Sequence, residues 1–214
     1  MTAENMASGD NDATAQQRVA DFFRFHVRLY GPDWRALGWQ SRKTQFQRFA
    51  VLAEVGTLAN RRVLDVGCGL GDLYGYLQSR HIPTVYTGYD LVPEMVAHAR
   101  QRYPEAQFTV RDVLQGLGDE QFDYILSSGA FNVDFGNNMA AVQRVLRDMF
   151  QHCIHGVAIN FLSTSAAYHD TVLYHYEPQE LYAFCRTFCP HVRLREGYLP
   201  NDFTLYLYPQ APTS

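Results

Sequence analysis

One stretch of the chain decides the fold: Val63-Leu64-Asp65-Val66-Gly67-Cys68-Gly69-Leu70-Gly71-Asp72-Leu73. It begins as a short apolar strand, passes through a turn with three glycines and continues into a helix. Glycine allows positive φ angles and lets a ligand approach the backbone closely. Turns at the carboxyl ends of strands bind ligands in open α/β sheets. The stretch therefore predicts a ligand site where this strand ends.

Short apolar strands alternate with helices after this turn, which predicts an α/β fold. Because strands separated by helices pair in parallel, we expect a doubly wound, mostly parallel sheet of seven strands. The last two strands are joined by a short link and should form an antiparallel hairpin at the sheet edge. The expected strands are 61–66, 84–90, 107–111, 122–127, 156–162, 192–198 and 203–208, and the expected helices are 70–79, 93–102, 139–152 and 178–189.

The chain divides into three segments by composition. Residues 1–15 are rich in Ser, Gly, Asn, Asp and Thr, which predicts a disordered tail. Apolar side chains recur at helical spacing within residues 16–58, which predicts an N-terminal helical cap. Residues 59–209 contain the glycine turn and all the expected strands, and are expected to form the ligand-binding domain.

Charge and cysteine usage narrow the class of function. The 214 residues carry a net charge of −4 and no basic cluster, which disfavours nucleic acid or an anionic membrane as a partner. A signal-peptide pattern and an apolar run of membrane-spanning length are both missing, so we expect a cytoplasmic protein. The four cysteines form no CxxC pair, and we expect neither disulfides nor a metal site.

Two acidic residues indicate what kind of ligand the glycine turn binds. A dinucleotide site would carry a third glycine where this chain has Asp72, and Asp65 precedes the turn. Both carboxylates would repel a pyrophosphate. A ligand with a positively charged sulfonium and an amino group would be attracted instead. Asp90 ends the next strand, where an acid can accept hydrogen bonds from both hydroxyls of a ribose.

The segment Asp65–Gly71 resembles the first motif of the class I S-adenosylmethionine-dependent methyltransferases, and the resemblance covers roughly residues 61–161. It implies a Rossmann-like fold with residues 59–209 as the S-adenosylmethionine-binding domain. It further implies that Leu91 packs near the adenine, and that Asp112 and the amide of Val113 contact the adenine edge. The segment 122–132 resembles the fourth-strand motif, whose exit faces the reactive methyl group. The expected cofactor-binding residues are Asp65, Gly67, Cys68, Gly69, Gly71, Asp90, Leu91, Asp112, Val113, Ser128, Gly129 and, for the cofactor carboxylate, Arg48.

Methyl transfer mainly requires alignment of the acceptor with the methyl group in a dry, aromatic pocket. Asn132 follows the fourth strand and can hydrogen-bond an acceptor, so we take it and Tyr176 as candidate catalytic residues. The aromatic side chains that lie near loops or helix ends, Tyr30, Trp39 and Tyr168, are candidates for acceptor binding. His169 and His175 are further candidates for a general base.

Missing motifs favour a small-molecule acceptor. The fourth strand leads into Ser127-Ser128-Gly129-Ala130 rather than an Asn-Pro-Pro-Tyr motif, which disfavours methylation of DNA bases. An Asp…Asp-Asn set for a magnesium-dependent catechol methyltransferase is also missing. The chain resembles small bacterial methyltransferases of sugar or secondary metabolism, and is expected to act as a monomer or homodimer.

Two alternative functions remain open from the sequence. An enzyme of this fold can cyclise S-adenosylmethionine itself, which yields azetidine-2-carboxylate and methylthioadenosine. A non-catalytic module would bind the cofactor or a partner protein without turnover. The reaction products distinguish these alternatives from methyl transfer.

Overall fold

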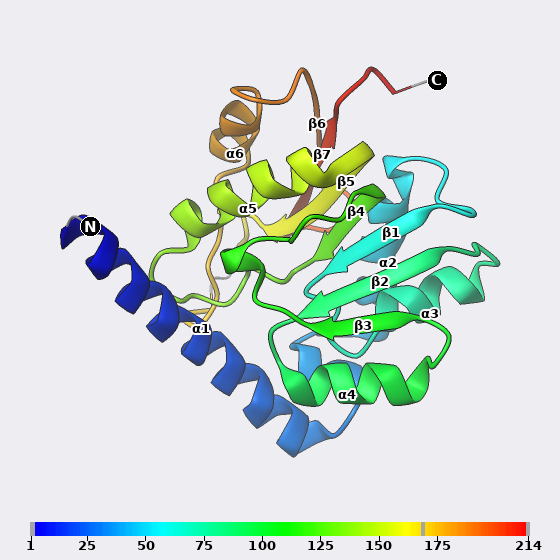
Figure 1. Ribbon diagram of the computed structural model, residues 1–214, viewed down its shortest axis with the longest axis horizontal. Helices are drawn as coiled ribbons and strands as arrows, with labels where there is room; N and C mark the ends of the chain where they lie inside the picture. The colour runs from blue at the N-terminus through cyan, green and yellow to red at the C-terminus, as the bar shows by residue number, and fades with distance from the viewer. Residues whose placement is uncertain (1–2, 168–169, 213–214) are drawn as a thin grey trace.

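A computed structural model describes residues 3–167 and 170–212, and shows a seven-stranded sheet with helices on both faces (Figure 1). The strand order is β3-β2-β1-β4-β5-β7-β6, with β7 antiparallel to both of its neighbours and the other pairs parallel. The mostly parallel sheet and the C-terminal hairpin expected from the sequence are confirmed. The strands are β1 (Arg62–Val66), β2 (Val85–Asp90), β3 (Gln107–Val110), β4 (Phe122–Ser128), β5 (Cys153–Leu162), β6 (His191–Arg195) and β7 (Asp202–Tyr208).

Two apolar cores lie on opposite faces of the sheet because successive strand residues point to opposite sides. Val63 packs with the helices at residues 42–52, 72–79 and 93–102 on one face, whereas Leu64 packs with the helices at residues 138–152 and 178–185 on the other. Burial on both sides explains the nearly continuous apolar runs in the central strands. The helices are α1 (Ala3–Tyr30), η1 (Trp34–Leu37), α2 (Arg42–Leu52), η2 (Ala53–Val55), α3 (Asp72–Ser79), α4 (Pro93–Arg102), η3 (Val113–Gln115), α5 (Asn138–His152) and α6 (Pro178–Cys185).

The long helix α1 differs from the sequence prediction. It begins at Ala3, so residues 3–15 are helical where the composition predicts a disordered tail. Once a helix is nucleated, each further residue gains one backbone hydrogen bond, so a polar extension needs no buried face. The division into a tail, a cap and a binding domain stays a prediction.

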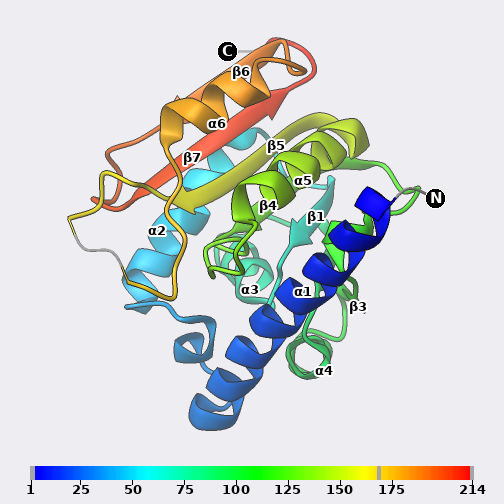
Figure 2. The same ribbon diagram turned by 90° about the vertical axis from the view of Figure 1, so that its left-hand side faces the viewer.

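The same helix runs along the edge of the sheet where the parallel strands end (Figures 1 and 2). Its Val19 and Phe23 reach the crevice above the glycine turn. The N-terminal region is thereby positioned over the predicted ligand site. Among the described residues, none of the helices combines the length and apolar character of a bilayer span.

Helix α6 ends earlier than the apolar pattern predicts. The expected helix 178–189 stops at Cys185, after which Thr187 and Phe188 donate to carbonyls three residues back. This tighter winding is typical of a helix terminus. Pro190 follows closely and cannot continue a helix, which accounts for the early end.

Candidate active site

The glycine turn has backbone geometry that side chains would prevent. Gly67 and Gly69 have φ angles of 75° and 52°, which favour glycine over other residues. A Cβ atom at position 67 would lie 2.3 Å from the Cβ of Ala130, so the turn approaches the exit of β4 closely. Gly71 serves a different purpose, because a Cβ there would lie 3.0 Å from Phe108 and Tyr103, on the core side. Position 71 therefore allows packing and lies outside the crevice.

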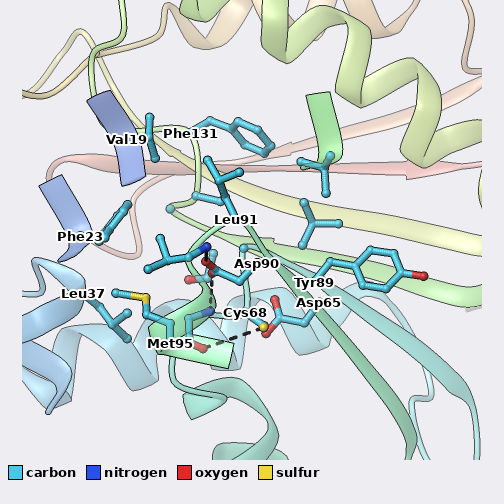
Figure 3. A pocket seen from close by; sticks show the side chains of 18 of the residues that line it. Val19, Phe23, Leu37, Asp65, Cys68, Tyr89, Asp90, Leu91, Met95 and Phe131 are labelled. Carbon is cyan, nitrogen blue, oxygen red and sulfur yellow. Dashed lines mark hydrogen bonds between the residues drawn. The ribbon is translucent and has the colours of Figure 1, made fainter. Parts of the chain in front are cut away.

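Asp90 connects the glycine turn to the end of β2. Its Oδ2 accepts from the amide of Gly69 and its Oδ1 from the amide of Val92, each at 2.8 Å. Each carboxylate oxygen retains a second lone pair for a ligand hydroxyl. Burial raises the pKa of Asp90, although the backbone donors oppose this effect. The side chain lies in the middle of the crevice, beside Leu91 (Figure 3).

The structure brings ten of the twelve predicted cofactor residues into one crevice. Figure 3 labels Asp65, Cys68, Asp90 and Leu91 among them. Apolar side chains of α1, η1 and α4, among them Phe23, Leu37 and Met95, line its other walls. Gly71 and Arg48 are the two that lie outside the lining. The role of the ten as cofactor ligands stays a prediction, and they are Asp65, Gly67, Cys68, Gly69, Asp90, Leu91, Asp112, Val113, Ser128 and Gly129.

Asp65 is a buried carboxyl group of the crevice whose pKa is raised well above its ordinary value. Its side chain is buried and accepts a hydrogen bond from the hydroxyl of Tyr86. Burial raises the pKa of Asp65 to about 7, and the nearby charges of Asp90 and Asp72 add to the increase. The Tyr86 hydrogen bond opposes this shift but is the smaller effect. A ligand cation beside Asp65 would favour its charged form.

Asp72 is paired within the protein, in contrast to Asp65. Its carboxylate contacts Arg102 at 2.7 Å and Arg42 at 3.2 Å, and accepts a hydrogen bond from the side-chain Nε2 of Gln45 at 2.9 Å. These partners come from α4 and α2, so Asp72 ties both helices to the start of α3. We therefore assign Asp72, which stands where a dinucleotide site would carry its third glycine, a structural role.

Arg48 is engaged elsewhere than the sequence predicts. Its guanidinium makes a two-point contact with Asp202, with Nε and Nη2 each 2.7 Å from a carboxylate oxygen. It also stacks 4.8 Å above the ring of Trp39. This arrangement does not support the expectation that Arg48 binds the cofactor carboxylate. Asp202, 154 residues away in the sequence, already accepts from two nitrogens of the guanidinium group.

Tyr176, predicted to be catalytic, lies in the core instead. Its side chain is fully buried and its hydroxyl donates to the carbonyl of Phe131 at 2.7 Å. Asn138 contacts the same hydroxyl at 3.5 Å. A buried tyrosine needs such a partner for its hydroxyl, and here the bond holds the loop after β4. The residue lines neither of the cavities described here.

Tyr30 and Trp39, two of the aromatic residues predicted to bind the acceptor, lie in different environments. Tyr30 is 40% exposed at the end of α1, where Arg35 stacks on its ring, and it lines neither cavity. The helical pattern places it on the solvent side, which accounts for this correction. Tyr168 and His169 lie outside the described residues. Trp39 does line the crevice, as the sequence predicts.

A second cavity of about 350 Å³ adjoins the crevice, and we name it the acceptor chamber. Its volume is within the range of small-molecule sites. Asn132 lines it with Oδ1 accepting from the amide of Leu162 at 3.2 Å, while Nδ2 lies 3.2 Å from where a Cβ of Gly129 would be. The amide group is therefore directed at the junction of the two cavities. The residues shared by both linings are Phe23, Leu37, Trp39 and Gly129.

Sequence reasoning missed the contribution of α1 to the chamber. Phe22, Phe23 and His26 line it from one face of that helix. Their spacing signals a buried helix face, which is the same signal that a core-packing helix gives. The position of the helix over the strand ends decides that the face meets a cavity rather than the core.

Replacing Tyr176 by phenylalanine tests its reassignment. We expect a loss of about 1 kcal/mol in the free energy of unfolding, because the carbonyl of Phe131 loses the Tyr176 hydroxyl and keeps only Nδ2 of Asn138, at 3.2 Å, as a side-chain donor. We expect the affinity for S-adenosylhomocysteine to change less than threefold, because the hydroxyl lines neither cavity. Urea denaturation and calorimetric titration measure the two effects. A large loss of turnover in a stably folded variant would restore the catalytic assignment.

Comparison with known proteins decides the family. Residues 63–155 match a family model described as a methyltransferase domain. The chain is 31% identical over 148 residues to Rv1506c of Mycobacterium tuberculosis, which is named as a methyltransferase. That match spans 66% of the chain and 89% of the relative. The chain belongs to the class I S-adenosylmethionine-dependent methyltransferases.

This methyltransferase is also similar to another methyltransferase in sequence and to a further one in fold. It is 48% identical over 80 residues to trans-aconitate 2-methyltransferase of Mycobacterium sp. strain KMS, a match that covers 37% of the chain and 31% of that relative. Its fold matches magnesium protoporphyrin IX methyltransferase of Synechocystis PCC 6803, solved with bound SAH, at a TM-score of 0.67 and 14% identity. This alignment covers 92% of our chain and 100% of the other. The family, fold and cofactor expected from the sequence are confirmed.

Proposed function

We propose that this methyltransferase transfers a methyl group from S-adenosylmethionine, bound in the crevice, to a small molecule bound in the acceptor chamber. The observation that carries the proposal is the shared wall of the two cavities, formed by Phe23, Leu37, Trp39 and Gly129. An acceptor in the chamber would meet the cofactor at the exit of β4. The acceptor belongs, on this proposal, to sugar or secondary metabolism.

The residues of the crevice offer groups that suit the hydroxyls and the positive charges of the cofactor. The turn at Gly67 and Gly69 lets a ligand approach the backbone, and Asp90 keeps a lone pair on each oxygen for the ribose hydroxyls. Asp65 lies where its buried carboxyl group would gain from a neighbouring ammonium. S-adenosylmethionine supplies an electrophilic methyl group when bound.

The protein contributes alignment and exclusion of water. Val19 and Phe23 of α1 cover the crevice with apolar side chains, which lowers the water content around the reacting atoms. Asn132 can position the acceptor through Nδ2, because Leu162 already holds its Oδ1. Helix α1 and the loop after β4, which are distant in the sequence, thus both contribute walls to the acceptor chamber.

Product identity tests the proposal. The protein is incubated with S-adenosylmethionine and a low-mass metabolite extract of the cells that make it, and the nucleoside products are measured by mass spectrometry. We expect S-adenosylhomocysteine together with a methylated metabolite, and at least about tenfold less of both with the Asp90→Ala variant when S-adenosylmethionine is subsaturating. Methylthioadenosine with azetidine-2-carboxylate would establish the cyclisation alternative instead. An unchanged cofactor would favour a binding module.

A further inference from the structure

The charges of the acceptor chamber restrict the acceptor. Among the described residues, Arg48 is its only arginine or lysine, and that charge is neutralised by the two-point contact with Asp202. Both partners are largely buried, with side-chain exposures of 11% and 2%. Asp170 adds another carboxylate to the lining. A carboxylate acceptor would therefore enter a chamber without an uncompensated cation, at a considerable desolvation cost.

Hydrogen-bond donors at the junction favour an acceptor that carries oxygen. The indole Nε1 of Trp39 is buried and has no hydrogen-bond partner. An unpaired buried donor is costly, so a bound oxygen within its reach would be stabilised. Asn132 presents a second donor, Nδ2, beside Gly129. A protonated amine has no lone pair to offer to either group, whereas a hydroxyl oxygen does.

His26 supplies a base on the α1 side of the chamber. Its Nδ1 lies 2.8 Å from the carbonyl oxygen of Phe22, which can only accept, so Nδ1 carries the proton of the neutral ring. Nε2 is then unprotonated and able to take a proton. The Phe22 ring packs at 4.2 Å from the imidazole and limits its rotation. A base held in one tautomer is what a protic acceptor requires.

We propose that the acceptor chamber takes an uncharged hydroxylated molecule and that His26 removes its hydroxyl proton; this inference rests on the proposed function. The hydroxyl oxygen forms a bond to the methyl carbon while the carbon–sulfur bond breaks and its electron pair stays on sulfur. The hydroxyl proton moves to Nε2 of His26 and is later released to water. The product is a methyl ether, with S-adenosylhomocysteine as the second product.

The class of product tests the nature of the acceptor. The protein is supplied with S-adenosylmethionine labelled in its methyl group and with the low-mass extract, and the labelled metabolites are fractionated. We expect label in an uncharged, alkali-stable methyl ether. Label released by alkali as methanol would indicate a methyl ester, and label retained on a cation exchanger would indicate a methylated amine. Either result would overturn this inference and leave methyl transfer intact, whereas no labelled metabolite would overturn both.

The role of His26 is tested by its replacement beside a matched control. His152 makes the same contact, Nδ1 to the carbonyl of Asp148 at 2.8 Å, on α5 and outside the chamber. We expect His26→Gln to slow labelling of the extract about 100-fold and His152→Gln to slow it less than twofold. Affinity for S-adenosylhomocysteine should stay within twofold in both variants. Equal rates in the two variants would overturn the role of His26.

Chemical rescue separates proton transfer from mere support of the helix. In the His26→Ala variant, added imidazole can occupy the vacated space and accept the proton. We expect imidazole to raise the labelling rate of the His26→Ala variant at least tenfold and to leave the rate of the wild type unchanged. Rescue that fails, in a variant whose thermal unfolding matches that of the wild type, would contradict a catalytic role for His26.

Discussion

Replacement of Asp90 by alanine is expected to weaken binding of S-adenosylmethionine and S-adenosylhomocysteine by at least about 2 kcal/mol, or roughly 30-fold. The substitution removes the proposed acceptor of both ribose hydroxyls. It also deprives the amides of Gly69 and Val92 of their partner, so the turn loses its support at the same time. Calorimetric titration with each ligand measures the loss, and NAD should bind neither the wild type nor the variant.

Asp148 provides the matched control for this experiment. Its carboxylate also accepts from a backbone amide, that of Leu117 at 2.8 Å, but it lies outside the crevice. We expect Asp148→Ala to cost some stability and to leave the ligand affinity within twofold of the wild type. Equal losses of affinity in the two variants would mean that Asp90 acts through general stability and not through contact with the ligand.

Replacement of Asp65 by asparagine is expected to stabilise the ligand-free protein above pH 7 and to lower its affinity for the cofactor. Burial raises the pKa of Asp65 to about 7 in the folded chain, against a reference value of 3.8. The wild type therefore loses stability as the pH rises from about 4 to 7, because the unfolded chain ionises first. A difference of about 3 in pKa corresponds to on the order of 4 kcal/mol.

Chemical denaturation at pH 6 and pH 8 measures this effect. Asparagine can still accept from the hydroxyl of Tyr86, so the comparison isolates the charge of residue 65. The stability advantage of the variant should be larger at pH 8 than at pH 6. A variant that is destabilised equally at both values would show that the carboxyl group is not perturbed in the folded protein.

The same titration affects the cofactor. A cationic ligand favours the ionised form of Asp65, so wild-type affinity for S-adenosylmethionine should rise between pH 6 and pH 8 and proton release should accompany binding. The Asp65→Asn variant should bind more weakly and lose that part of the pH dependence. Affinity that is independent of pH in the wild type would argue against contact between Asp65 and the ligand cation.

The crevice could be predicted from the sequence because its parts are local. The glycine turn and Asp90 each follow an apolar strand, and parallel strands bring their carboxyl ends to one edge of the sheet. The parallel pairing of those strands follows from the alternation of strands and helices. The glycine turn and Asp90 can each be recognised from a short segment of sequence, without knowledge of distant contacts.

The remaining site residues depend on contacts that no local pattern reveals. Arg48 has the right chemistry for a carboxylate, but its partner is Asp202, which reaches it only because β7 lies beside β5. Tyr176 follows a loop, yet its hydroxyl is used by Phe131. His26 repeats at core spacing, and only the path of α1 over the strand ends turns that face toward a cavity.

A structure of the protein in complex with S-adenosylhomocysteine tests the central claim most directly. The account predicts the ribose hydroxyls on the carboxylate of Asp90, the ligand backbone against Gly67 and Gly69, and the ammonium beside Asp65. The sulfur should face the junction formed by Trp39 and Gly129. A ligand bound elsewhere, or a crevice filled by side chains of α1 in the presence of saturating ligand, would contradict the account.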